Sequence, residues 1–221
     1  MKESLMIAVF IIIVFVVLQY IGKNIVMKKM TTSLEEEKYD AFFKTSQSIL
    51  CFLFVKPYIK ESMKLSAYIA QEESEEVKKE IALIENMRIK PQQKLMSISN
   101  AFYFFLGKRE EASCKQMLDY VKKLGDERTY NNLKIQYDIF ILKESKHIDE
   151  IKKKLEIAQR NNMPNKDLMV GSLEYLIGLQ YSYLNDKKNM MKYFKPALIY
   201  CKGTTYEVEM NQVIEKMNEN I

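Results

Sequence analysis

The sequence predicts an all-α protein: one N-terminal transmembrane helix followed by antiparallel helix pairs that stack into a short α-solenoid. Three observations support this prediction. Only 6 Gly and 4 Pro occur in 221 residues, which is too few for the frequent turns of an all-β fold. An apolar run dominates the N-terminus, and helix–turn–helix patterns recur after residue 91.

The N-terminal apolar run extends from Leu5 to Leu18 without a polar residue and continues to Gly22 with Gln19 as its one polar interruption. At about 1.5 Å per residue it reaches about 27 Å, close to the hydrocarbon thickness of a bilayer, about 30 Å. Tyr20 lies where an interfacial aromatic is expected. Residues 1–29 are therefore predicted to form a transmembrane anchor with a basic flank.

Two alternatives to the anchor are a buried core helix and a cleaved signal peptide. A core helix at a chain terminus is seldom apolar on every face. Cleavage requires small residues before the cut, and Tyr20 is bulky. The chain is thus predicted to be a single-pass membrane protein. The C-terminal flank of the run carries Lys23, Lys28 and Lys29, so the positive-inside rule favours a cytoplasmic domain over an extracytoplasmic one.

Residues 30–90 are predicted to form the N-terminal helices of the domain. Ser33 and Glu36 match a capping box, so a helix is expected to begin there and run to Val55. Its segment 49–55 is apolar on all sides and is expected to be core, the alternative being a surface that meets a partner or a membrane. Further helices are expected over 57–71 and 74–89.

Residues 91–204 repeat a helix–turn–helix pattern three times. The predicted turns lie at Leu106-Gly107, Leu142-Lys143 and Leu184-Asn185-Asp186, with spacings of 36 and 42 residues. Paired helices that recur at such a period are typical of α-solenoids, whose units bury their apolar faces on one another. Thr204 and Glu207 match a second capping box, and residues 205–221 are predicted to form a C-terminal capping helix.

The last of these units resembles the tetratricopeptide repeat. Gly178 follows Ile177 at the motif's apolar-small pair and Tyr181 comes three residues later, while Phe194 and Ala197 match positions of the second helix. The resemblance implies that Gly178, Tyr181, Leu184, Phe194 and Ala197 pack the repeat, and that its curved surface binds peptides or proteins. It implies no catalytic activity.

The unit also departs from the motif. Met190 stands where the motif has Ala, and Pro196 lies inside the predicted second helix. Weaker copies run over 100–112 and 136–148, so the resemblance covers about 91–204.

Residues that could perform chemistry are scarce. The single histidine, His147, is expected to be a surface residue, and no nucleophile, phosphate-binding or metal-binding motif occurs. Cys51, Cys114 and Cys201 lack metal-ligand spacing and are expected to be buried free thiols. No catalytic residue, cofactor-binding residue or metal ligand is predicted, and the chain is not expected to be an enzyme.

The charge pattern argues against nucleic acid as a partner. The net charge is +5, and Lys2, Lys23, Lys28 and Lys29 against Glu3 place +3 of it in the first 29 residues. The remaining charges of both signs are interspersed, whereas a nucleic-acid site needs a concentrated basic face. Lys-, Asn- and Ile-rich usage is typical of an AT-rich bacterial genome.

The expected function is a membrane-anchored scaffold that binds an unidentified protein partner through its helical surface. Tyr175, Tyr183 and Tyr193 are the candidate partner-surface residues, since tyrosine combines a large contact area with a polar tip; inter-helix packing is the alternative role. A structural subunit of a membrane complex is the second hypothesis, which exposed apolar area would favour. An unrecognised membrane-associated enzyme is the third.

Overall fold

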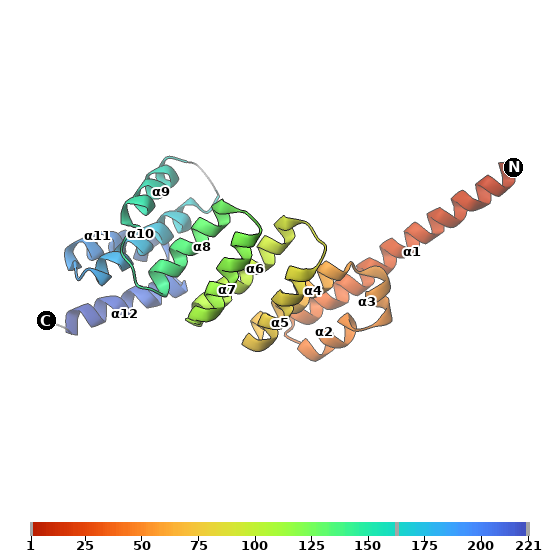
Figure 1. The fold of residues 1–221 in the computed structure, drawn as a ribbon, viewed down its shortest axis with the longest axis horizontal. Helices are drawn as coiled ribbons and strands as arrows, with labels where there is room; N and C mark the ends of the chain where they lie inside the picture. The colour runs from red at the N-terminus through yellow and green to blue at the C-terminus, as the bar shows by residue number, and fades with distance from the viewer. Residues whose placement is uncertain (1, 162–163, 220–221) are drawn as a thin grey trace. The chain divides into compact units, whose positions relative to one another are not determined.

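The computed structural model describes residues 2–161 and 164–219, and no side chain is described for 2–5, 7–9 and 11. Met1, Asn220 and Ile221, the ends of the predicted segments 1–29 and 205–221, lie outside the described residues. Within those residues the chain contains helices and turns but no strand, so the all-α prediction is confirmed (Figure 1). The chain divides into two compact units, residues 1–126 and 127–221, and the boundary falls inside the predicted array 91–204.

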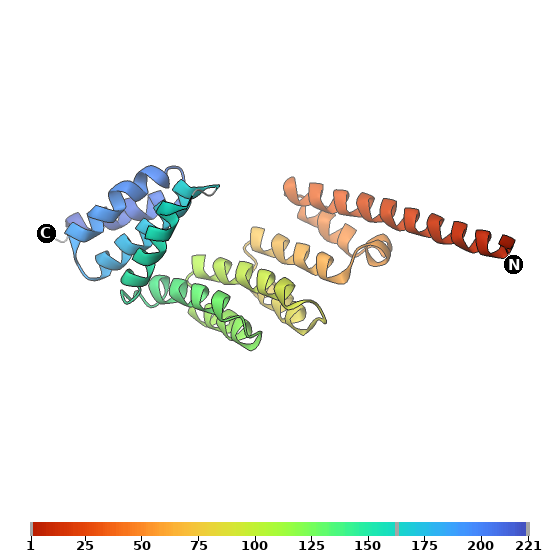
Figure 2. The ribbon, with the colours of Figure 1, turned by 90° about the horizontal axis from the view of Figure 1, so that it is seen from above.

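The first unit contains the helices α1 Lys2–Glu35, α2 Tyr39–Ser46, α3 Ile49–Phe54, α4 Pro57–Ala70, α5 Ser74–Asn86, α6 Pro91–Gly107 and α7 Glu111–Lys123. Pro57 and Pro91 begin α4 and α6, as expected of a residue whose missing N–H is not needed in the first turn. The short helices α2 and α3 pack along the C-terminal part of α1 (Figure 2).

The predicted transmembrane anchor is wrong. The apolar run is the start of α1, which does not end at the basic flank but continues to Glu35. Further along α1, Val26 and Met30 are buried in a core with Phe42 of α2 and Cys51 of α3, so protein rather than lipid covers this stripe. Over the part of the chain that the structure describes, no helix combines the length and the apolarity needed to cross a bilayer. The prediction of a single-pass membrane protein, and the orientation predicted for it, are therefore wrong as well.

The second unit contains α8 Glu127–Phe140, α9 Ile148–Arg160, α10 Lys166–Tyr183, α11 Lys187–Tyr200 and α12 Thr205–Glu219. Its core is one apolar cluster to which all five helices contribute. The fully buried members at its centre include Ile139, Ile177, Met190 and Phe194. The predicted turns at 142–143 and 184–186 are confirmed, whereas Leu106 and Gly107 are the last residues of α6 and the turn follows at 108–109.

One turn geometry recurs between paired helices. The first helix ends in a left-handed residue, and the next N–H bonds back to the carbonyl five residues earlier, a Schellman closure. The left-handed residues are Glu37, Glu72, Arg109 and Asn185. The closures are Lys38 to Ser33 at 2.8 Å and, at 3.0 Å each, Glu73 to Tyr68, Glu110 to Phe105 and Asp186 to Tyr181. The pairs α1–α2, α4–α5, α6–α7 and α10–α11 therefore share a supersecondary unit.

Neighbouring turns of the first unit are also joined to each other. Lys108 Nζ donates to the Glu72 carbonyl at 2.7 Å, and Ser74 Oγ donates to Glu110 Oε1 at 2.7 Å. Both bonds connect residues 36 positions apart, so the α4–α5 turn lies beside the α6–α7 turn. Repeated side-by-side contact of this kind is characteristic of stacked helical hairpins.

Candidate interaction surfaces

The α10–α11 pair is the tightest helix contact of the second unit. A Cβ on Gly178 would lie 2.3 Å from the Phe194 ring, and one on Gly171 would lie 2.6 Å from Tyr200 Cβ. The two helices can approach this closely only because α10 has no side chain at these positions. Phe194 and Ala197 are fully buried at this contact, where the resemblance to the tetratricopeptide repeat places them.

The other two residues predicted to pack the repeat lie nearer the surface. Leu184, the C-cap of α10, is 54% exposed, so it contributes little to the packing. Tyr181 is half-buried, and its ring stacks on that of Tyr193 with centroids 5.8 Å apart and 12° between the planes. The Tyr181–Tyr193 stack thus bridges α10 and α11 at the edge of the core.

The three candidate partner-surface tyrosines have different environments. Tyr175 is 1% exposed, packs between Phe194 and Tyr206, and bonds Glu209 through its hydroxyl, so it belongs to the core. Tyr183 is half-buried and donates to the Ile139 carbonyl at 3.0 Å. Tyr193 is half-buried in the stack with Tyr181. Of the three, Tyr183 and Tyr193 therefore retain exposed surface.

Two lysines border the stack and were not singled out in the sequence. Lys152 Nζ of α9 donates to the Tyr181 hydroxyl at 3.0 Å and lies 5.4 Å from the centre of that ring. Its hydrogen bond to Tyr181 raises the pKa of Lys152. Lys192 Nζ lies 5.5 Å from the Tyr193 ring. We call these four residues, Lys152, Tyr181, Lys192 and Tyr193, the aromatic–lysine face.

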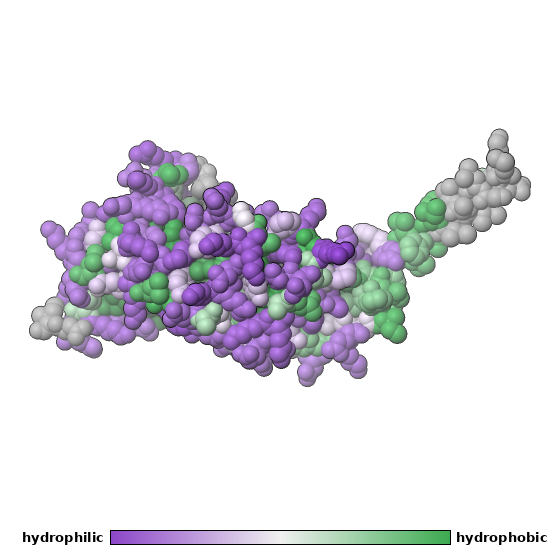
Figure 3. Space-filling model, in the orientation of Figure 1, coloured by the Kyte–Doolittle hydropathy of each residue, from purple (hydrophilic) through white to green (hydrophobic). Residues whose placement is uncertain are grey.

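The apolar segment 49–55 is mostly not core, contrary to the prediction. Cys51 and Val55 are buried, but Ile49, Leu50, Phe52 and Leu53 are exposed, Phe52 by 82%. In the space-filling view the hydrophobic colour gathers over this end of the first unit (Figure 3). Exposed patches of large apolar side chains are often found at interaction sites, so this patch is a candidate surface.

A polar cluster surrounds Asp138 at the end of α8. Its carboxylate is buried and contacts His147 Nε2 at 2.9 Å, Lys146 Nζ at 3.1 Å and the Lys134 ammonium. Burial alone would raise the pKa of Asp138, but hydrogen bonds from Lys134, His147 and Lys146 lower it below its usual value. The His147 side chain is only 14% exposed, so the histidine expected at the surface instead ties the start of α9 to α8.

The same cluster has ligand atoms at a spacing that a metal ion could bridge. One atom each from Asp138, Glu144 and His147 lie within 4.8 Å of one another. Two lysine ammonium groups already contact Asp138, however, and the Lys146 ammonium also contacts Glu144. A cation would have to displace these ammonium groups, so the arrangement is best explained as an ion-pair network.

Two further buried sites hold carboxyl groups. In the first unit Lys64 Nζ lies 2.8 Å from Glu61 and 2.9 Å from Glu80, joining α4 to α5. Burial raises the pKa of Glu80 to about 7, although Lys64 opposes the shift. In the second unit Glu174 is buried, one of its oxygens has no hydrogen-bond partner, and burial raises its pKa to about 7. Burial and the nearby Glu174 carboxylate together raise the pKa of the buried Cys201 thiol.

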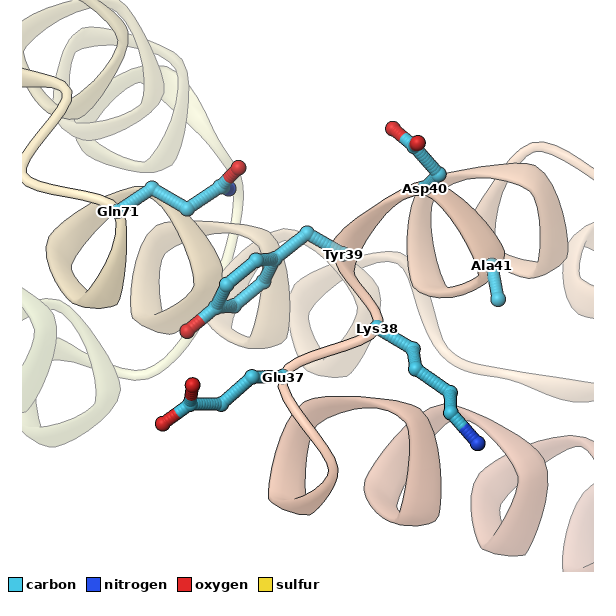
Figure 4. Close-up of a pocket in the computed structure, with 6 residues that line it drawn as sticks. All are labelled: Glu37, Lys38, Tyr39, Asp40, Ala41 and Gln71. Atoms are coloured by element: carbon cyan, nitrogen blue, oxygen red, sulfur yellow. The ribbon is translucent and has the colours of Figure 1, made fainter.

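A shallow pocket lies at the α1–α2 turn, lined by Glu37, Lys38, Tyr39, Asp40, Ala41 and Gln71. Tyr39 extends between Gln71 and Glu37, while Asp40 and Lys38 point away from it (Figure 4). These six residues include no cysteine, serine or histidine, and their charged groups diverge, so the pocket offers no catalytic arrangement.

Comparisons with protein-family models, curated proteins and solved structures each found no match.

Proposed function

We propose that this chain is a helical interaction module that binds an acidic segment of a protein partner on its aromatic–lysine face. The observation that carries the proposal is the half-buried Tyr181–Tyr193 stack with an ammonium group beside each ring. Large amphipathic rings are the side chains most often used to anchor protein partners. The proposal includes no membrane anchor.

The chemistry of the aromatic–lysine face favours a partner segment with carboxylates and apolar side chains. Lys152 and Lys192 provide positive charge at the rim, and the tyrosine rings provide flat apolar area between them. The stack is attached to the tight α10–α11 contact, so the face is held rigidly and loses little conformational entropy on binding. The resemblance of α10–α11 to the tetratricopeptide repeat supports the same type of function.

The proposal can be tested by selecting peptides from a random library on the full chain and measuring their affinity by fluorescence anisotropy. We expect the selected peptides to be acidic with at least one apolar anchor. Tyr193→Ala and Lys152→Ala are each expected to weaken binding by about tenfold, the usual loss for a central aromatic or paired charge.

The matched control is Ile199→Ala, which removes a large exposed side chain from the same helix outside the stack. It is expected to change the affinity by less than about twofold, because isolated surface contacts contribute little. Circular dichroism would verify that all three variants remain folded. Selection of no peptide, or equal losses in Tyr193→Ala and Ile199→Ala, would contradict the proposal.

A further inference from the structure

The helix α3 is fixed to α1 by one face and presents its other face to solvent. On the fixed face, Cys51 Sγ lies 3.8 Å from Met30 Sδ, and the Phe54 ring packs on Gly22, where a Cβ would lie 2.7 Å from it. Ser48 caps the helix by accepting a bond from the Cys51 N–H at 3.2 Å. The side chains of Ile49, Leu50, Phe52 and Leu53 are thereby held outward on a rigid support rather than on a loose loop.

The exposed face of α3 continues onto α1. Gly22, against which Phe54 packs, lies between Leu18, Ile21 and Ile25, which are exposed by 57%, 48% and 62%. We call these three residues together with Ile49, Leu50, Phe52 and Leu53 the apolar platform. Figure 3 shows the hydrophobic colour over α3 and the adjoining part of α1.

The charge around the apolar platform has one sign. Residues 4–34 contain no Asp or Glu, and neither do residues 41–60. The same two segments contain six lysines: Lys23, Lys28, Lys29, Lys44, Lys56 and Lys60. Lys60 is partly engaged by Glu61 at 2.8 Å, while Lys23, Lys28, Lys29, Lys44 and Lys56 are exposed. The surface therefore selects a partner that is both apolar and anionic.

We infer that the apolar platform docks onto the surface of an anionic lipid layer, with the lysines at the level of the headgroups. Bulky apolar side chains flanked by lysines are the combination that holds amphipathic helices at such surfaces. Contact is from one side, along the surface, and no helix has to pass through the layer.

Two other occupants fit less well. A second copy of the chain would carry the same lysines and no compensating carboxylates in these segments, so two platforms brought together would repel. A protein partner is usually anchored by side chains that enter a hollow, whereas Phe52, at 82% exposure, protrudes. Headgroups and acyl chains deform around protruding side chains and need no such hollow.

The experiment uses the full chain and vesicles of phosphatidylcholine with or without phosphatidylglycerol. We compare the double variant Phe52→Ser/Leu53→Ser with a matched control, Leu83→Ser/Met96→Ser, which removes two exposed apolar side chains elsewhere in the unit. Cosedimentation of the chain with phosphatidylglycerol vesicles is expected to fall about tenfold or more in the first variant. It is expected to stay within about twofold in the control.

The lysines are tested by Lys28→Gln/Lys29→Gln. This variant is expected to lose affinity for phosphatidylglycerol vesicles but not for phosphatidylcholine vesicles, and added salt is expected to reduce the difference. Equal binding of the wild type to both vesicle types would overturn the choice of an anionic surface.

A local probe separates α3 from the rest of α1. Leu53→Cys is labelled with an environment-sensitive fluorophore, since the three native cysteines are buried. A lipid-dependent blue shift that spin-labelled lipids quench supports the inference. An unchanged spectrum on bound vesicles, or a blue shift that depends on protein concentration without lipid, overturns it; the latter result would assign the platform to a second copy.

Discussion

At the scale of single residues, Gly178 determines how closely α10 and α11 pack. Gly178→Ala would place a methyl carbon 2.3 Å from the Phe194 ring, which is fully buried. Overpacking of this kind costs about 1–3 kcal/mol, and the better helix propensity of Ala returns about 1 kcal/mol of it. We therefore expect a net loss of up to about 2 kcal/mol in the free energy of unfolding, measured by urea denaturation.

Gly107→Ala is the control for that substitution. Gly107 also lies in a helix, but no atom lies within 4 Å of where its Cβ would be. The propensity gain is then unopposed, and stability should stay equal or rise slightly. A similar loss in both variants would mean that backbone freedom, rather than the contact with Phe194, explains the glycine.

Glu174 makes the stability of the second unit depend on pH. Burial raises its pKa to about 7 from an ordinary value of 4.5, so the folded state binds a proton more tightly than the unfolded state. The stability that the second unit has with Glu174 protonated is fully present below about pH 4.5. It is lost as the pH rises through about 7, because the buried carboxyl then ionises. Full ionisation should cost on the order of 3 kcal/mol.

Glu174→Gln is expected to remove this loss, because the amide stays neutral and fills the same space. The test measures the free energy of unfolding of both proteins from pH 5 to pH 8. The exposed Glu215→Gln is the control and should leave the wild-type slope unchanged. A wild-type stability that is flat or rises over this interval would exclude Glu174 as the cause.

The sequence predicted some of these residues and missed others for a physical reason. Gly178, Phe194 and Ala197 could be placed in the packing between two helices because they match positions of the tetratricopeptide repeat, and Phe194 and Ala197 are fully buried. Lys152 could not be paired with Tyr181, since the two lie on different helices and their contact depends on how α9 packs. The prediction that Tyr175 lies on a partner surface failed for the same reason, because the sequence does not show which tyrosines are buried.

At the scale of helices, the contact between α4 and α5 depends on one lysine between two buried carboxyls. Lys64→Ala would leave Glu61 and Glu80 facing each other without that ammonium. Removing one partner of a buried ion pair typically costs 3–5 kcal/mol. We expect a loss of about 3 kcal/mol at pH 8, where the wild type keeps Glu80 ionised beside Lys64, measured by urea denaturation.

Two further variants identify the cause of that loss. Glu80→Gln in the Lys64→Ala background should recover part of the stability, because it removes the carboxylate that lost its lysine, while Glu61 keeps its ion pair with Lys60 at 2.8 Å. Lys79→Ala, which breaks an exposed pair with Glu76 at 2.6 Å, should leave the free energy of unfolding almost unchanged. Equal losses in Lys64→Ala and Lys79→Ala would show that the buried pair adds nothing.

The helix boundaries show where reading the sequence succeeds and where it fails. Pro57 and Pro91 correctly marked the starts of α4 and α6. Ser33 was taken for a helix start, yet it is a buried residue near the end of α1, whose apolar stripe of Val26 and Met30 carries the helix through it. The helix is followed by a turn at Glu37, which has a left-handed conformation. The sequence does not indicate this conformation, because residues other than glycine seldom adopt it.

The division between α2 and α3 was missed for a related reason. Thr45 and Ser46 bond the backbone carbonyls of Ala41 and Phe43 at 2.8 Å each, and Ser48 bonds the Thr45 carbonyl at 2.7 Å. Hydroxyl side chains that compete for backbone groups favour helix ends. The apolar segment 49–55 was then expected to be core, because periodicity cannot distinguish a buried segment from an exposed one when every face is apolar.

At the scale of the whole molecule, the recurring hairpin turn also occurs in a part of the chain that lies before the predicted helical array 91–204. The turns at Glu37 and Glu72 precede residue 91, where the predicted array begins. The chain nevertheless divides at residue 126 into two compact units, and the apolar clusters around Phe42 and around Phe194 each lie within one unit. Shared hairpin geometry and separate cores are compatible, because a turn is set locally while a core is set by packing.

Separate cores lead to a prediction about cooperativity. If each unit unfolds around its own core, Gly178→Ala should lower protection from hydrogen exchange only within residues 127–221, and Lys64→Ala only within 1–126. Hydrogen exchange measured by mass spectrometry under native conditions reports the protection of each unit separately, since local opening free energies follow cooperative units. The stability losses of the double variant should then add to within about 0.5 kcal/mol, as for independent sites. Loss of protection in both units from either single variant would instead show that the chain unfolds as one cooperative body.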